Sequence, residues 1–154
     1  MEVIINYLNE YLTLSTLKGE ITAKIKISYE ESDEKEPLVE LKLYYDGKVY
    51  HSSNYDYFWI RTFANLQNQL PKDINIKCCL TCKHGNLCPV GNCHNELFCT
   101  KDVVINEKSD LFFYTEEDNE RDTRSRKYTF VCNDYKPQNN DYFTYNDYLY
   151  YLVK

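Results

Sequence analysis

Residues 20–29 read EITAKIKISY, and this stretch decides the fold of the N-terminal half. Apolar and polar side chains alternate along it, which is the period of a strand with one buried and one solvated face. Residues 39–43 (VELKL) repeat the alternation. Asp46-Gly47 then provides a hairpin signal, because a type I′ turn requires positive φ at both central residues. With residues 48–51 as the returning strand, these segments predict an antiparallel β meander.

The segment after the meander changes to the period of a helix. Its apolar side chains recur at i, i+4, i+7 and i+11, on one helix face: Trp59, Phe63, Leu66 and Leu70. Asn54 or Asp56 is suited to cap the start of this helix, and Pro71 lies just past its end. The sequence therefore predicts one amphipathic helix directly after the meander.

Shorter apolar runs predict further strands or helices, although their type is less clear from the pattern. Residues 2–12 fit either a strand or a short helix, whereas residues 73–79, 96–100 and 127–132 each predict a short strand. The tyrosine-rich residues 141–152 predict a short helix or an extended tail. Strands and helix in this arrangement are typical of an α+β protein.

Charge and apolar content exclude some classes of partner. The net charge is −6, whereas binding to nucleic acid phosphates requires a concentrated basic surface. No segment approaches the roughly 18–20 apolar residues that cross a bilayer, and the N-terminus lacks the basic region of a signal peptide. We therefore expect a cytoplasmic protein with no nucleic acid or membrane partner. Thiols stay reduced in that compartment, so the seven cysteines indicate metal binding before disulfides.

The cysteines are concentrated in residues 78–99, which read CCLTCKHGNLCPVGNCHNELFC. The centre of this stretch is the pair Cys79-x-x-Cys82. Two intervening residues allow both sulfur atoms to bind one ion from a single tight turn, as in tetrahedral zinc sites. Gly85 and Gly91 suit the turns that would bring later cysteines back toward the pair.

The other ligands are less clearly indicated. Cys99 and Cys132 each end a short strand-like run and would be held rigidly, whereas Cys78 lies on the opposite side of its strand from Cys79. Four side chains in the cysteine-rich loop are alternative metal ligands: Cys88, Cys93, His84 and His94.

The cysteine pattern resembles that of a family of uncharacterised bacterial proteins. In that family a C-x-x-C pair precedes a Pro-x-Gly turn, a third Cys follows, and a fourth lies in a later strand. The matching positions, within roughly residues 76–135, are Cys79, Cys82, Pro89, Gly91, Cys99 and Cys132. The resemblance implies that the metal ligands are Cys79, Cys82, Cys99 and Cys132. Some members lie beside secreted toxins and are suspected immunity proteins, so it also implies such a role here.

Other interpretations of the cysteines remain open. The spacing Cys79-x2-Cys82-x5-Cys88-x4-Cys93 is similar to the auxiliary-cluster motif of SPASM domains, so an iron–sulfur cluster competes with zinc. Buried free thiols and a catalytic thiol are further alternatives. A site with four thiolates leaves no position for a catalytic water, which favours a structural zinc and a protein that is not an enzyme.

The predicted function is that of a cytoplasmic immunity-type protein, which binds and neutralises a partner toxin and contains a structural zinc site. The tyrosine-rich tail is the expected contact surface, in particular Tyr142, Tyr145 and Tyr148, with Tyr150 and Tyr151 beside them. The alternatives are a metal- or redox-responsive binding protein, or an enzyme whose site matches no known motif.

The predicted organisation is one domain over residues 1–154, with no repeat and no linker. Residues 1–75 form the β meander and the helix, residues 76–135 a cysteine-rich metal-binding region, and residues 136–154 the tyrosine-rich tail. The expected fold class is α+β, in which an antiparallel meander with one amphipathic helix is followed by a zinc-stapled second half.

Overall fold

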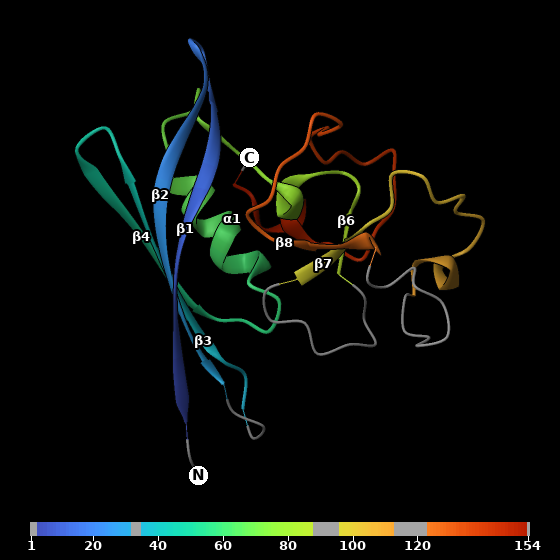
Figure 1. The fold of residues 1–154 in the computed structure, drawn as a ribbon, viewed down its shortest axis with the longest axis horizontal. Coiled ribbons are helices and arrows are strands. Elements are labelled where there is room, and N and C mark those ends of the chain that lie inside the picture. The colour runs from blue at the N-terminus through green and yellow to red at the C-terminus, as the bar shows by residue number, and fades with distance from the viewer. Residues whose placement is uncertain (1–2, 32–34, 88–95, 113–122, 154) are drawn as a thin grey trace.

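The computed structural model describes residues 3–31, 35–87, 96–112 and 123–153. Within these residues lie a five-stranded antiparallel sheet, the helix α1 and a three-stranded sheet (Figure 1). The larger sheet has the order β4-β3-β2-β1-β5. Its strands are β1 (Ile4–Thr16), β2 (Gly19–Glu31), β3 (Leu38–Tyr45), β4 (Lys48–Tyr55) and β5 (Asn75–Lys77). The α+β class and the antiparallel meander are confirmed.

The meander follows directly from its local sequence. Strands β1 and β2 pair without interruption from Ile4↔Glu31 to Thr16↔Gly19, so the ambiguous N-terminal segment is a strand. The β3–β4 hairpin turns at Asp46 and Gly47, whose φ values are 52° and 73°. These two positive φ values are those that the Asp-Gly signal predicts.

Helix α1 (Ile60–Gln69) lies between the larger sheet and the second half of the chain (Figure 1). The sheet face toward α1 is fully or almost fully buried along its central strands, at Leu12, Leu14, Ile25, Ile27, Leu41 and Leu43. Trp59, at the start of the helix, is completely buried. Its ring lies 4.8 Å from that of Tyr29 and 5.2 Å from that of Tyr128, measured between centroids. Because Tyr128 belongs to the second half, Trp59 joins the two halves of the core.

The start of α1 is stabilised from upstream. Trp59 has a left-handed backbone (φ 64°) and makes no side-chain cap. Instead, Asp56 Oδ2 accepts hydrogen bonds from the backbone N–H of Thr62 (3.0 Å) and from its hydroxyl (3.1 Å). Of the two predicted capping residues, Asp56 therefore satisfies a free N–H group of the first helical turn. Pro71 follows the helix as predicted.

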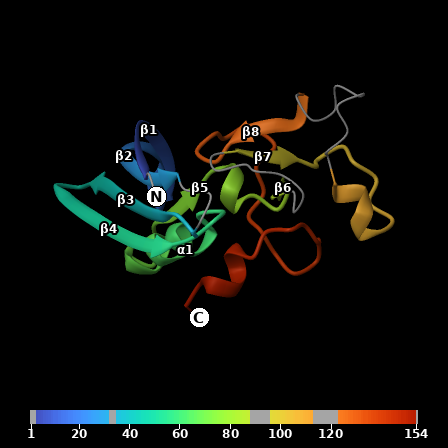
Figure 2. The same cartoon turned by 90° about the horizontal axis from the view of Figure 1, so that it is seen from below.

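The second half has little regular structure (Figure 2). Its sheet consists of β6 (Gly85–Asn86), β7 (Glu96–Cys99) and β8 (Ser125–Lys127), in that order. Three short 3₁₀ helices accompany it: η1 (Cys79–Thr81), η2 (Lys108–Leu111) and η3 (Tyr148–Tyr151). The tail ends on α1, where Asn68 Nδ2 donates to the Tyr151 carbonyl at 3.2 Å.

The predicted short strands are only partly confirmed. The strand at residues 96–100 is β7, and the strand at residues 73–79 is reduced to β5. The strand predicted at residues 127–132 is wrong, because β8 ends at Lys127 and a turn follows. Consecutive Tyr128 and Thr129 are both buried, which breaks the alternation of a strand, and Phe130 N–H donates to the Lys127 carbonyl at 3.1 Å. No helix in the described part of the chain has the length and apolar character needed to cross a membrane.

Removal of the Asp56 carboxylate should weaken the helix start. We expect Asp56→Ala to lower the free energy of unfolding by about 1–3 kcal/mol, because the buried N–H and hydroxyl of Thr62 lose their acceptor. Urea denaturation followed by the fluorescence of Trp59 measures the change. Asp56→Asn keeps a side-chain oxygen and should lose less. An Asp56→Ala protein as stable as the wild type would contradict the capping role.

Candidate metal centre

The chain makes consecutive tight turns across the Cys-x-x-Cys pair. Thr81 N–H donates to the Cys78 carbonyl (3.1 Å) and Cys82 N–H to the Cys79 carbonyl (3.2 Å). Gly85 N–H then donates to the Cys82 carbonyl (3.0 Å). Cys79 begins η1 and Cys82 directly follows it. One short segment therefore presents both thiols of the pair, as the spacing predicts.

Gly85 is required by a close approach of the backbone. A Cβ atom at this position would lie 2.1 Å from the Cys79 carbonyl oxygen and 3.3 Å from that of Cys82. The contact of 2.1 Å is far shorter than van der Waals distance, and the atom that it meets is main chain, which cannot rotate away. The prediction that Gly85 serves the turn is confirmed; Gly91 lies outside the described residues.

Two distant cysteines come to this turn. Cys99, the last residue of β7, is paired with Gly85 in the smaller sheet. Cys132 follows a segment that is hydrogen-bonded to η1, since Cys79 N–H donates to the Phe130 carbonyl at 2.6 Å. Four thiols thus line one cavity of about 20 Å³: Cys79, Cys82, Cys99 and Cys132. A volume of this order holds about one water-sized sphere.

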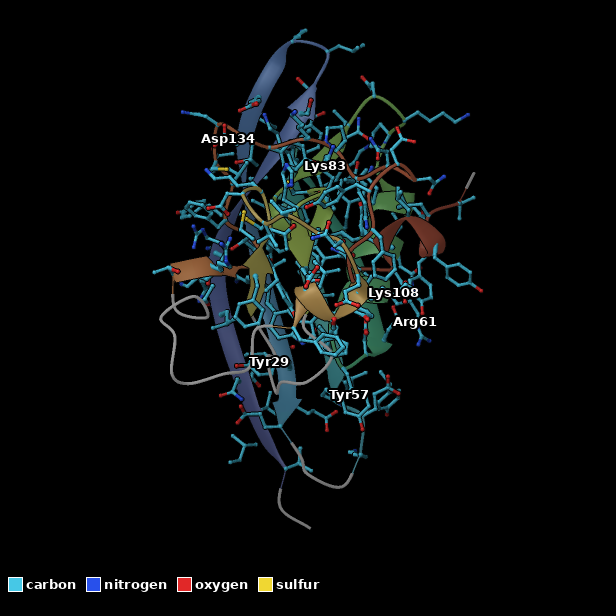
Figure 3. All side chains as sticks on the ribbon, turned by 90° about the vertical axis from the view of Figure 1, so that its right-hand side faces the viewer. Tyr29, Tyr57, Arg61, Lys83, Lys108 and Asp134 are labelled. Carbon is cyan, nitrogen blue, oxygen red and sulfur yellow. The ribbon has the colours of Figure 1, made fainter. Side chains whose placement is uncertain are left out.

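The rest of the cavity wall includes side chains with charge or ligand chemistry. His84, Lys101 and Asp134 line the cavity together with the thiols, and Lys101 Nζ donates to Asp134 Oδ2 at 2.7 Å. Figure 3 shows Asp134 on the same side of the molecule as the sulfur atoms. His84 Nδ1 is buried and has no hydrogen-bond partner among the residues that the structure describes. It is therefore a fifth group at the site with unused ligand capacity.

The environment of Cys79 and Cys82 disfavours the ionisation of these two thiols without a cation. Burial raises the pKa of the Cys79 thiol well above its usual range. Neighbouring thiols raise this pKa further: Cys78, Cys82, Cys99 and Cys132. Burial also raises the pKa of Cys82, although the backbone N–H groups of Lys136 and His84 donate to its sulfur and oppose the shift. A bound divalent cation would remove the mutual repulsion of the thiolates.

The thiols share a cavity without yet converging on one point. The five described cysteines, Cys78 among them, are all free thiols. Within the described ranges, no group of three or more His, Cys, Asp or Glu side chains is already arranged to hold a metal ion. Cys78 is fully buried and does not line the cavity, consistent with its predicted position opposite Cys79. The alternative ligands Cys88, Cys93 and His94 lie outside the described residues.

The tail tyrosines differ in their surroundings. Tyr148 is only 4% exposed and belongs to the core, so it is not available to a partner in this structure. Tyr142 is half-buried, and its hydroxyl is 3.0 Å from that of Thr100. Tyr145 is also half-buried, with its ring 5.2 Å from the ring of Phe143. The exposed tail tyrosine is Tyr150, at 81%.

Several residues that build the site were not predicted. Asn146 Nδ2 donates to the carbonyls of Leu80 (2.8 Å) and Gly85 (3.1 Å) and fixes the tail to the turn. Only tertiary structure reveals this contact. Lys101 lies two positions after Cys99, and Asp134 lies two positions after Cys132. Residues at this spacing share a face of an extended segment, which gives a weak signal in the sequence.

The fold and the site together define an α+β protein with a partly buried cluster of four thiols. No protein-family model, curated protein or solved structure matches the chain. The chemistry of the site therefore rests on its own residues. Thiolates are soft ligands that suit Zn²⁺, Cu⁺ and iron–sulfur clusters.

Gly85→Ala should open the turn that presents the thiol pair. We expect a loss of about 1–3 kcal/mol in the free energy of unfolding, because the added methyl group displaces main chain. The cavity thiols should also react faster with a thiol reagent such as Ellman's reagent. Gly47→Ala is the control for thiol reactivity: it strains a turn of positive φ in the other half of the chain, where the methyl group meets no atom within 4 Å, so it should lower stability without changing the reactivity of the cavity thiols. Unchanged thiol reactivity in Gly85→Ala would contradict the close packing of this turn.

Proposed function

We propose that Cys79, Cys82, Cys99 and Cys132 hold one structural zinc ion, and that the chain is a non-catalytic protein that binds another protein. The observation that carries this proposal is the convergence of four thiols, from segments distant in sequence, on one small cavity. Four thiolates would complete a tetrahedral zinc site and leave no position for substrate or catalytic water. The ion would then act as a clamp.

The size of the cavity favours a single ion. Its volume of about 20 Å³ suits one metal atom with Zn–S distances of about 2.3 Å. An iron–sulfur cluster contains several iron and sulfide atoms and requires more room. His84 is the alternative fourth ligand, because its Nδ1 atom is buried without a hydrogen-bond partner at this cavity.

The clamp would also order the C-terminal tail. The peptide groups of the turn bond directly to the tail, since Lys83 N–H donates to the Lys136 carbonyl (2.9 Å) and Gln138 N–H to the Thr81 carbonyl (3.1 Å). Asn146 adds its two hydrogen bonds to the Leu80 and Gly85 carbonyls. Movement of the turn would therefore be transmitted to residues far from the thiols.

The tail provides the proposed contact surface. Residues 138–153 line most of a hollow of about 860 Å³. Two of the residues that line it are exposed, Tyr150 at 81% and Phe143 at 45%. Exposed aromatic side chains beside a concave surface are typical of the anchoring residues of protein interfaces. These two residues take the place of Tyr148 in the predicted contact surface.

The proposed partner is a protein toxin, which the chain would neutralise by covering the surface through which the toxin acts. The net charge of −6 supports a basic partner, because opposite charge accelerates encounter. The toxin itself is suggested by the resemblance of the cysteine pattern to suspected immunity proteins. The cytoplasm, where the thiols would stay reduced, is the proposed location.

Substitution of the cavity cysteines should remove the metal. We expect Cys79→Ser, Cys82→Ser, Cys99→Ser and Cys132→Ser each to lose most of one zinc equivalent, measured by elemental analysis of purified protein. Cys78→Ser is the matched control, because Cys78 is buried beside the turn but does not line the cavity, and it should keep its zinc. Retention of a full equivalent by Cys79→Ser and Cys132→Ser would overturn this ligand set. Loss of zinc in His84→Ala with retention in Cys132→Ser would favour histidine as the fourth ligand.

Partner binding should depend on the exposed aromatic residues of the tail. The wild-type chain, used as bait in a lysate of its source organism, should capture a protein that arrests growth when expressed alone and is harmless when co-expressed with the chain. Phe143→Ala/Tyr150→Ala should weaken that binding at least tenfold, whereas Val104→Ala, an exposed apolar control, should not. Chelation of the zinc should weaken binding as well. Recovery of no such protein would count against the proposal.

A further inference from the structure

Strand β1 is much longer than its partner on one side. It pairs with β2 over its whole length of 13 residues, but with β5 only from Thr13 to Ser15. Within the described part of the chain, no strand pairs with residues 4–12 on the side away from β2. In Figure 1 the N-terminal end of β1 extends below the second half of the molecule. The larger sheet therefore has an open edge nine residues long, from position 4 to position 12.

The backbone groups on this edge can be identified from β5. The N–H of Ile76 bonds to Gln67 Oε1 (2.7 Å) and its carbonyl accepts from the Thr81 hydroxyl (3.0 Å), so both point away from β1. The flanking pairs Ser15↔Asn75 and Thr13↔Lys77 are then the hydrogen-bonded pairs, because the two kinds of pair alternate. The N–H and C=O groups of odd-numbered β1 residues thus face the open edge: Ile5, Tyr7, Asn9 and Tyr11.

The free edge of β5 and the open edge of β1 differ in whether their backbone N–H and C=O groups already have hydrogen-bond partners. At β5, side chains of Gln67 and Thr81 occupy the outward N–H and C=O groups of the edge. Residues 4–12 read IINYLNEYL, with no Pro or Lys and one charged residue, Glu10. Ile5, Tyr7 and Tyr11 are 52%, 74% and 69% exposed. A long edge strand with a single charge and no proline is a template for another strand.

We propose that a second copy of this chain pairs with the open edge, β1 against β1 in antiparallel orientation, to form one continuous sheet across a two-fold axis. If the two-fold axis passes through Leu8, the midpoint of the open segment, all the residues of that segment pair with the second copy. Tyr7 then faces Asn9 of the second copy in a hydrogen-bonded pair, and Ile5 faces Tyr11 of the second copy. The inference does not depend on the zinc or on the toxin.

The edge is complementary to itself in this register. Its one charged side chain, Glu10, faces the neutral Asn6 of the second copy, so no like charges meet. Ile5 and Tyr11 form an apolar pair on the outer face, and the pair occurs twice because of the two-fold symmetry. Leu8 of each copy meets the other at the axis. Glu10 is the single charge of this edge, and its Oε1 atom lies 3.5 Å from Lys127 Nζ of its own chain.

The test is the mass of the full-length protein in solution, measured by sedimentation from low to high micromolar concentration. We expect a dimer of the wild type that dissociates on dilution. Asn9→Pro removes an N–H group that faces the open edge and leaves the β1–β2 ladder intact, so it should give a folded monomer. Asn9→Ala keeps the N–H group and should remain dimeric. A monomeric wild type across this range, or a dimeric Asn9→Pro, would overturn the proposal.

A charge exchange tests the register and does not rely on proline. Ile5→Lys/Tyr11→Lys places like charges opposite each other at both symmetry-related pairs and should abolish the dimer. Ile5→Lys/Tyr11→Glu places opposite charges at the same pairs and should restore it. Both positions are exposed, so circular dichroism should show a native fold for both variants. Equal dimerisation of the two variants would show that this register is wrong.

Discussion

The second half of the molecule depends on the close approach of Gly85 to the carbonyl of Cys79. This contact folds the main chain back on itself and leaves the peptide groups of the turn directed outward. Those groups bond to three other segments: Phe130 accepts from Cys79, Gln138 donates to Thr81, and Asn146 donates to Leu80 and Gly85. In the described part of this region, which has only three short strands, these bonds satisfy peptide groups that no ladder pairs. A metal ion held by the thiols of the same turn would stabilise every one of these contacts together.

The two halves of the chain are stabilised by different means. In the first half, alternating apolar residues bury one face of a regular sheet under α1, and the main chain is satisfied by the ladders. In the second half, side-chain amides and hydroxyl groups replace the ladders, as in the bond from Asn86 Nδ2 to the Leu111 carbonyl at 2.8 Å. The indole of Trp59 packs against Tyr128 and so connects the two halves of the chain. Loss of order in the second half would therefore expose part of the first core.

Local periodicity was enough to predict the first half and the centre of the site. Strands β2 and β3, the Asp46-Gly47 turn and the apolar face of α1 each follow from short-range patterns, and the Cys79-x-x-Cys82 spacing predicted the thiol turn. The rest depends on contacts between distant residues. Tyr128 is buried because Trp59 lies across from it, which removes the strand expected at Cys132. Tyr148 is buried because the tail returns to α1, and the place of His84 at the cavity depends on the same tertiary arrangement.

Several tyrosines near the thiol cavity have a packing role in this structure. A tyrosine packed against a protein interior needs a partner for its hydroxyl group. Threonine provides it for two half-buried tyrosines: the hydroxyl of Tyr135 lies 2.9 Å from that of Thr81, and the hydroxyl of Tyr142 lies 3.0 Å from that of Thr100. Thr81 is in the thiol turn and Thr100 follows Cys99, so both bonds anchor the tail beside the cavity. Burial raises the pKa of Tyr135 well above its usual range, because the phenolate form would be poorly solvated there. Tyrosine in this region acts as a large apolar side chain with one polar anchor, and that combination suits a core built around irregular main chain.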